Sequence, residues 1–146
     1  MNDDLFTPTV TDKASDLARP WRVDSLLFPG FFGGPLAATV LGVINGRRLG
    51  VGTRAQAAVV ATGLLAIVGR LVVITAVGEF TGVRVVIALA GVTVWGAILL
   101  TQRRAFRGFQ LTGGEPARLL WPGLAAAIGG FVVEALLLVA VQGAGS

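Results

Sequence analysis

Residues 55–78 have the sequence AQAAVVATGLLAIVGRLVVITAVG, which carries a single charged side chain, Arg70. Three more stretches are similarly apolar: residues 26–44, 84–101 and 119–142. A helix rises 1.5 Å per residue, so each stretch is near the roughly 20 residues needed to cross about 30 Å of hydrocarbon. The sequence predicts an all-α integral membrane bundle of four transmembrane helices.

Little of the chain remains outside these stretches, because 54% of the 146 residues are apolar and the mean hydropathy is +0.79. No separate soluble domain is expected. Residues 1–24 are predicted to form a flexible polar tail with an interfacial segment in which Trp21 lies at headgroup level, and residues 25–146 to form the transmembrane domain. The first apolar run starts only at Leu26 after an acidic beginning, so no cleaved signal peptide is expected.

The net charge of +4 reflects arginines at the ends of the apolar stretches, where they contact headgroups, so no nucleic-acid partner is expected. If all four stretches cross the membrane, seven basic residues fall on one face and four on the other. The positive-inside rule then predicts a multi-pass protein of the inner (plasma) membrane with both termini outside. The two sets are Arg47, Arg48, Arg54, Arg103, Arg104, Arg107 and Arg118, against Lys13, Arg19, Arg22 and Arg84.

The composition argues against catalysis, because the chain has no Cys, His or Tyr. This excludes thiol chemistry, disulfides, imidazole bases and the usual zinc sites. Serine occurs only at 15, 25 and 146, and Glu134 is the only carboxylate within a predicted span. We therefore expect no enzymatic activity, no metal and no cofactor.

Small residues recur every four positions in the first span. Such a stripe lets two helix backbones approach closely in lipid. It predicts helix packing within the chain or against a second copy, although glycine is also common in membrane helices. The stripe consists of Gly30, Gly34, Ala38, Gly42 and Gly46.

The same span contains Pro29 and Pro35. Pro35 cannot donate to the carbonyl of Phe31, so a kink or a broken helix is predicted near Gly33 and Gly34. Broken helices can bind ions or substrates through freed backbone groups, whereas most prolines only bend a helix to fit its neighbours.

Arg70 and Glu134 lie equally deep in the second and fourth spans, which predicts an intramembrane ion pair. Either charge alone would cost about 3 kcal/mol or more in the bilayer. In one interpretation the pair fixes helix packing. In the other, Glu134 carries a proton or cation, although an arginine neighbour favours the charged form of a carboxylate.

A shift of 60 positions aligns several small and apolar residues of the second and fourth spans, and Arg pairs end the first and third. This pattern is typical of two parallel hairpins from a duplication, or of chance matches among frequent residue types.

Residues 28–50 have the sequence FPGFFGGPLAATVLGVINGRRLG, which resembles a segment of small uncharacterised bacterial integral membrane proteins. The resemblance covers about a sixth of the chain and implies no activity. It rests on Gly33, Pro35, Leu36, Ala37, Asn45, Arg47, Leu49 and Gly50.

These observations favour a non-enzymatic accessory or scaffold subunit, embedded in the lipid bilayer, that associates with itself or with another membrane protein. The alternative is a small proton- or cation-coupled transporter that uses Glu134.

Overall fold

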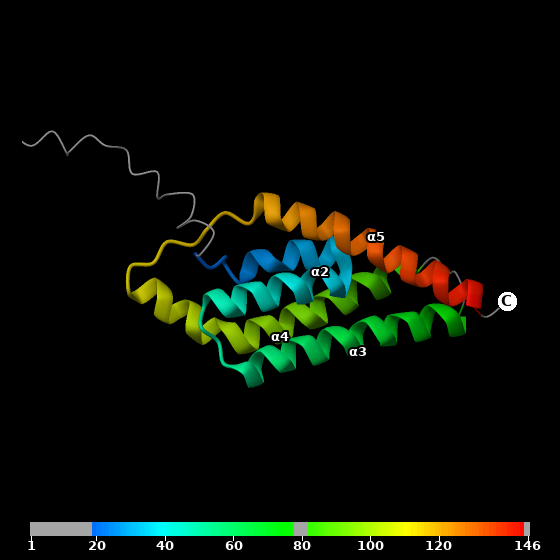
Figure 1. Ribbon diagram of the computed structural model, residues 1–146, viewed down its shortest axis with the longest axis horizontal. Helices are drawn as coiled ribbons and strands as arrows, with labels where there is room; N and C mark the ends of the chain where they lie inside the picture. Colours follow the sequence, from blue (N-terminus) through cyan, green and yellow to red (C-terminus); the bar gives the residue numbers. More distant parts are fainter. Residues whose placement is uncertain (1–18, 78–81, 145–146) are drawn as a thin grey trace, which may run out of the picture.

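The computed structural model describes residues 19–77 and 82–144, and these residues are almost entirely helical (Figure 1). A short 3-10 turn, η2 (Asp24–Leu26), leads into α2 (Leu27–Arg48), which is followed by α3 (Thr53–Val77), α4 (Val83–Leu111) and α5 (Leu120–Ala144). Each of α2 to α5 is long and apolar enough to span a membrane. The predicted all-α fold class is therefore confirmed.

The first of these helices is broken in the middle and folds back on itself. Gly34 has φ 75° and ψ −173°, outside the helical region, and Pro35 follows it. A Cβ on Gly30 would lie 3.2 Å from the Cβ of Ala38, whereas residues eight apart in a straight helix are separated by about 12 Å. Figure 1 shows the two halves of α2 side by side. The predicted break is confirmed, and it produces a hairpin of two short helices, residues 27–33 and 35–48, hereafter the first and second arms.

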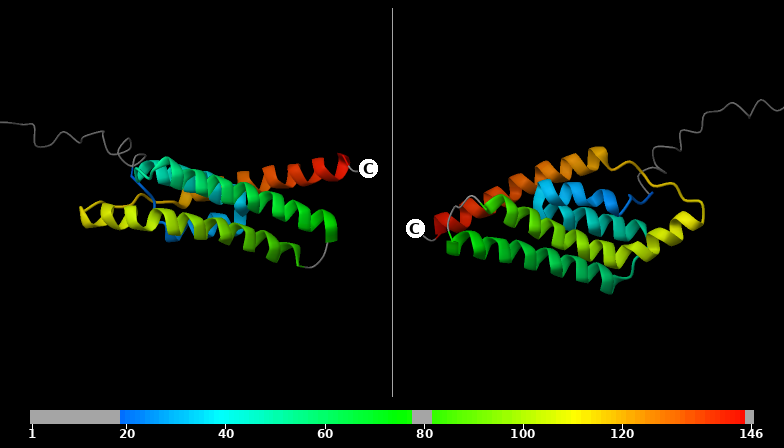
Figure 2. Two further views of the ribbon diagram at one scale, coloured as in Figure 1. Left: turned by 90° about the horizontal axis from the view of Figure 1, so that it is seen from below. Right: turned by 180° about the vertical axis from the view of Figure 1, so that it is seen from behind.

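The hairpin brings the beginning and the end of α2 to the same end of the bundle. The Trp21 backbone N–H donates to Asn45 Oδ1 at 2.7 Å, and Arg48 Nη1 donates to the carbonyl of Arg19 at 3.0 Å. The prediction that the first apolar stretch crosses to the far face was therefore wrong, because the break at Gly34 reverses the chain. Residue 19 and the loop 49–52 lie at one end, and the end of α5 lies at the other (Figures 1 and 2).

This topology concentrates positive charge at one end of the bundle. Among the described residues, Arg84 lies near the opposite end and Arg70 inside the bundle, and the remaining arginines lie near the end that holds the loops 49–52 and 112–119. The asymmetry is sharper than the one counted for four crossings, and it favours a cytoplasmic location for this basic end. The basic end carries Arg19, Arg22, Arg47, Arg48, Arg54, Arg103, Arg104, Arg107 and Arg118.

The hairpin α2 is the centre of the bundle. It packs against α3, α4 and α5, and α3 packs also against α4. The second arm runs parallel to α4, and α3 runs parallel to α5 (Figure 2). Half of the apolar window of α2 is buried inside the protein, against 11% for α5, so α5 is the most exposed of the four helices.

All five residues of the small-residue stripe lie at close contacts, but the break distributes them over both arms. Ala38 is completely buried. A Cβ on Gly30 would lie 3.3 Å from the Gly91 carbonyl oxygen of α4, and one on Gly42 would lie 2.5 Å from Ile98 Cδ1. Gly34 lies against α5 and Gly46 against Gln102 of α4. The small residues of the stripe therefore allow α4 and α5 to pack closely against the hairpin.

The segment before α2 is part of the bundle. Trp21, Val23 and Leu26 are buried, with Trp21 only 3% exposed, so its indole is covered by protein where headgroup contact was expected. The Arg48 guanidinium lies 4.0 Å from the Trp21 ring centroid, and the Trp95 indole N–H donates to the Val23 carbonyl at 3.2 Å. The predicted tail and interfacial segment, residues 1–24, is corrected for residues 19–24, which pack into the bundle. Residues 1–18 lie outside the described residues.

Single cysteines in this cysteine-free chain test the hairpin. Asp24, Thr53 and Thr112 are exposed at the basic end, and Gln142 is exposed at the opposite end. We expect an impermeant maleimide to label the first three from one side of sealed membranes and Gln142→Cys from the other. Labelling of Asp24→Cys and Thr53→Cys from opposite sides would contradict the hairpin.

Substitutions around the break test the packing. Gly34→Ala places a Cβ at φ 75° and ψ −173°, a backbone region reached essentially by glycine alone, which costs about 1–3 kcal/mol before any clash. Ala38→Leu overpacks a buried site at about 1–3 kcal/mol. Val40→Leu is the control, because Val40 is 47% exposed. Thermal unfolding in detergent should show losses for the first two variants alone. Equal behaviour of all three would show that the small residues are incidental.

Candidate functional site

Arg70 and Glu134 meet inside the bundle. Arg70 comes from the second half of α3 and Glu134 from near the middle of α5, and an Arg70 Nη1 to Glu134 Oε2 ion pair joins them. Both side chains are buried, at 8% and 4% exposed. The structure thus brings together the two charges that their equal depth in the sequence predicts to pair.

Glu134 has a second partner that the sequence analysis did not identify. Its Oε1 accepts a hydrogen bond from the backbone N–H of Leu36 at 2.8 Å. The second arm begins after Gly34, so Leu36 is one of the first-turn residues whose N–H has no acceptor within the helix. Pro35 precedes it at a position where a missing N–H costs nothing. Glu134 therefore caps a helix from a different helix.

Gly34 is needed at the break for two reasons. Its φ of 75° is readily adopted only by glycine. A Cβ there would also lie 2.5 Å from Glu134 Oε2, so only a glycine lets the carboxylate reach the end of the second arm. Gly33 also allows α2 to lie close to α5, since a Cβ on it would lie 2.9 Å from the carbonyl oxygen of Ala127 in α5.

Two positively polarised groups surround the Glu134 carboxylate. The carboxylate lies between the Arg70 guanidinium and the N-terminal end of the second arm, where the helix dipole is positive. The Nε of Arg70 is buried and has no hydrogen-bond partner among the described residues. Both carboxylate oxygens are thus engaged within the chain, whereas the Nε–H of Arg70 stays available to a further group.

A second buried polar network closes the basic end of the hairpin. Asn45 Nδ2 donates to Gln102 Oε1 at 3.0 Å, and Gln102 Nε2 donates to the Gly42 carbonyl at 2.6 Å. Asn45 Oδ1 accepts from the backbone of Trp21. Asn45 and Gln102 are at most 1% exposed. Each lies one residue beyond the predicted end of a span, so it was not expected inside the bundle. An amide directly at the end of an apolar run was the available signal.

Among the residues that the structure describes, no three His, Cys, Asp or Glu side chains gather as metal ligands. The centre has one carboxylate and one guanidinium, so it offers charge stabilisation and helix capping, and general acid–base catalysis by paired groups would need another residue.

Comparison of the chain with protein-family models, with curated proteins and with solved structures gives no match. The function of the protein therefore has to be inferred from its sequence and from the geometry of the bundle.

Proposed function

We propose that the protein is a non-enzymatic accessory or scaffold subunit of a bacterial plasma membrane, which associates with itself or with another membrane protein through helix packing. The observation that carries this proposal is that both oxygens of Glu134 are engaged by groups of the same chain. The two oxygens bind Arg70 of α3 and the Leu36 N–H of α2. The one carboxylate inside the described helices thus links three helices, which is a structural use.

The outward face of α5 supports association. A Cβ on Gly129 would have no atom within 4 Å, and Ala125, four residues earlier, is also exposed. This spacing permits close approach of another helix in lipid. The neighbouring Gly130 faces inward, where a Cβ would lie 2.6 Å from the Gly33 carbonyl oxygen. Two adjacent glycines therefore serve different contacts, one within the chain and one outside it.

Transport coupled to protons or cations is the second candidate function, and the broken helix favours it. Transporters place substrate sites at the ends of half-helices near the membrane midplane. The N-terminal end of the second arm, at Leu36, meets this description, and Arg70, whose Nε has no partner among the described residues, binds the same carboxylate. In this mechanism Glu134 would release Leu36 and Arg70 when it is protonated.

Substitutions of the ion pair discriminate between these functions. Glu134→Gln leaves Arg70 without its counter-ion, so we expect a loss of roughly 3–5 kcal/mol of stability if the pair is structural. Arg70→Leu with Glu134→Gln removes both charges and keeps an amide oxygen for the Leu36 N–H, so it should recover most of this loss. Arg70→Leu with Glu134→Leu should recover about 1–3 kcal/mol less, because that N–H loses its acceptor.

Thermal and denaturant unfolding in detergent measure these differences, and proton release on addition of candidate substrates is followed in parallel. A stable Glu134→Gln protein that no longer releases protons would favour transport and contradict the scaffold. An unstable Glu134→Gln protein rescued by Arg70→Leu would contradict transport.

The adjacent glycines of α5 test association separately from folding. Gly129→Leu fills open space, so the chain should fold normally and lose association, measured by crosslinking in native membranes. Gly130→Leu should destabilise the bundle itself, and Val139→Leu, at a 66% exposed position of α5, is the neutral control. Unchanged crosslinking of Gly129→Leu would show that this face contacts only lipid.

A further inference from the structure

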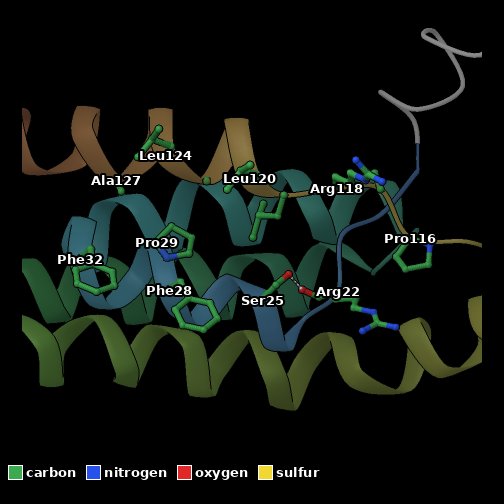
Figure 3. A pocket seen from close by; sticks show the side chains of 13 residues that line it. Arg22, Ser25, Phe28, Pro29, Phe32, Pro116, Arg118, Leu120, Leu124 and Ala127 are labelled. Carbon is green, nitrogen blue, oxygen red and sulfur yellow. Dashed lines mark hydrogen bonds between the residues drawn. The ribbon is translucent and has the colours of Figure 1, made fainter.

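A groove lies between the first arm of α2 and the first half of α5, and it plays no part in the charge centre (Figure 3). Its volume is about 710 Å³. The two helices diverge from their contact at Gly33 and Ala127 toward the basic end, where the segment 116–119 forms the end of the groove. The lining residues are Arg22, Ser25, Phe28, Pro29, Phe32, Pro116, Ala117, Arg118, Leu119, Leu120, Gly123, Leu124 and Ala127.

The body of the groove is apolar and open at the side of the bundle. Phe28 and Phe32, one helical turn apart on the first arm, are 66% and 68% exposed. Leu120 and Leu124, one turn apart on α5, are 73% and 49% exposed. Figure 3 shows these two rows of side chains along opposite walls. Because the side chains face out of the bundle, a molecule in the surrounding lipid can enter sideways.

The end of the groove is positively charged. Arg22, just before the first arm, and Arg118, just before α5, both lie at this end and are exposed (Figure 3). Neither side chain has an ion-pair or hydrogen-bond partner among the described residues. The beginning of α5 at Leu120 adds the positive end of a helix dipole. A groove with an apolar body and a cationic end is complementary to an anionic amphiphile.

We propose that this groove binds one anionic phospholipid, with its phosphate between Arg22 and Arg118 and an acyl chain between the two apolar walls. From Leu120 to Ala127 the groove extends about 10 Å along α5, which matches much of the roughly 15 Å of one leaflet's hydrocarbon. The volume is that of a small-molecule pocket. It is smaller than the roughly 800–1,100 Å³ that a 10 Å length of a partner helix with a diameter of 10–12 Å would occupy. The basic end meets the leaflet in which anionic lipids attract juxtamembrane arginines.

The experiment titrates the full chain in a mild non-ionic detergent with dioleoyl phosphatidylglycerol, with dioleoyl phosphatidylcholine, or with glycerol 3-phosphate. Native mass spectrometry counts bound lipid, and the shift in Tm gives the affinity. We expect saturable binding of one phosphatidylglycerol, binding of phosphatidylcholine at least about tenfold weaker, and no comparable effect of glycerol 3-phosphate. Equal binding of both lipids, or equal binding of the free headgroup, would overturn the proposal.

Two sets of variants locate the site. Arg22→Gln with Arg118→Gln should weaken phosphatidylglycerol binding by about tenfold to thirtyfold. Arg47→Gln with Arg54→Gln removes the same charge from exposed positions of the same end outside the groove, and should change binding less than about twofold. Equal losses in the two double variants would show non-specific attraction and overturn the site.

Leu124→Trp fills the groove and keeps both arginines, so it should abolish binding without a change in charge. It also keeps the proposal testable if the Arg22 and Arg118 double variant fails to fold. Retention of one tightly bound phosphatidylglycerol by a folded Leu124→Trp protein would exclude the groove as the acyl-chain site.

Discussion

The bundle depends on one hydrogen bond at the break in α2, between the backbone N–H of Leu36 and the carboxylate of Glu134. Hydrocarbon offers no water to a freed backbone group, so a broken helix in a membrane needs an acceptor from elsewhere in the protein. Glu134 supplies that acceptor from α5, and Arg70 of α3 balances its charge. A broken helix, a buried carboxylate and a buried guanidinium are each unfavourable alone, and here the hydrogen bond to Leu36 and the ion pair to Arg70 stabilise all three.

The position of α5 follows from this arrangement. Among the described helices, α5 packs mainly against the α2 hairpin, where Gly33 and Gly130 allow close backbone approach. Its remaining surface is apolar and exposed. The same helix therefore carries the cap of the hairpin on one side and the proposed association face on the other.

The first arm is short because the chain reverses at Gly34, and this has consequences at the basic end. Its entry is held by Trp21, Asn45 and Gln102, a fully buried network in which each amide is hydrogen-bonded. The entry segment is joined to the loop 112–119, where the Ala117 N–H donates to the Pro20 carbonyl at 3.0 Å. Between this junction and the contact of Gly33 with Ala127, the first arm and α5 diverge and leave the groove. The groove proposed to hold a phospholipid is thus a product of the same reversal that creates the charge centre.

The sequence by itself determined the helical fold class, the four apolar stretches, the break near Gly34 and the pairing of Arg70 with Glu134. These features follow from composition, proline chemistry and the cost of isolated charge, which act locally or through depth alone. The tertiary structure decided that the broken helix turns back, because a proline and a glycine permit a range of bend angles and only contacts between distant residues select one. That reversal changes the side on which residue 19 lies and turns Trp21 from an expected interfacial residue into a buried one. The capping of Leu36 by a residue 98 positions away, and the Asn45 and Gln102 network, depend likewise on which helices become neighbours, and no local pattern specifies that.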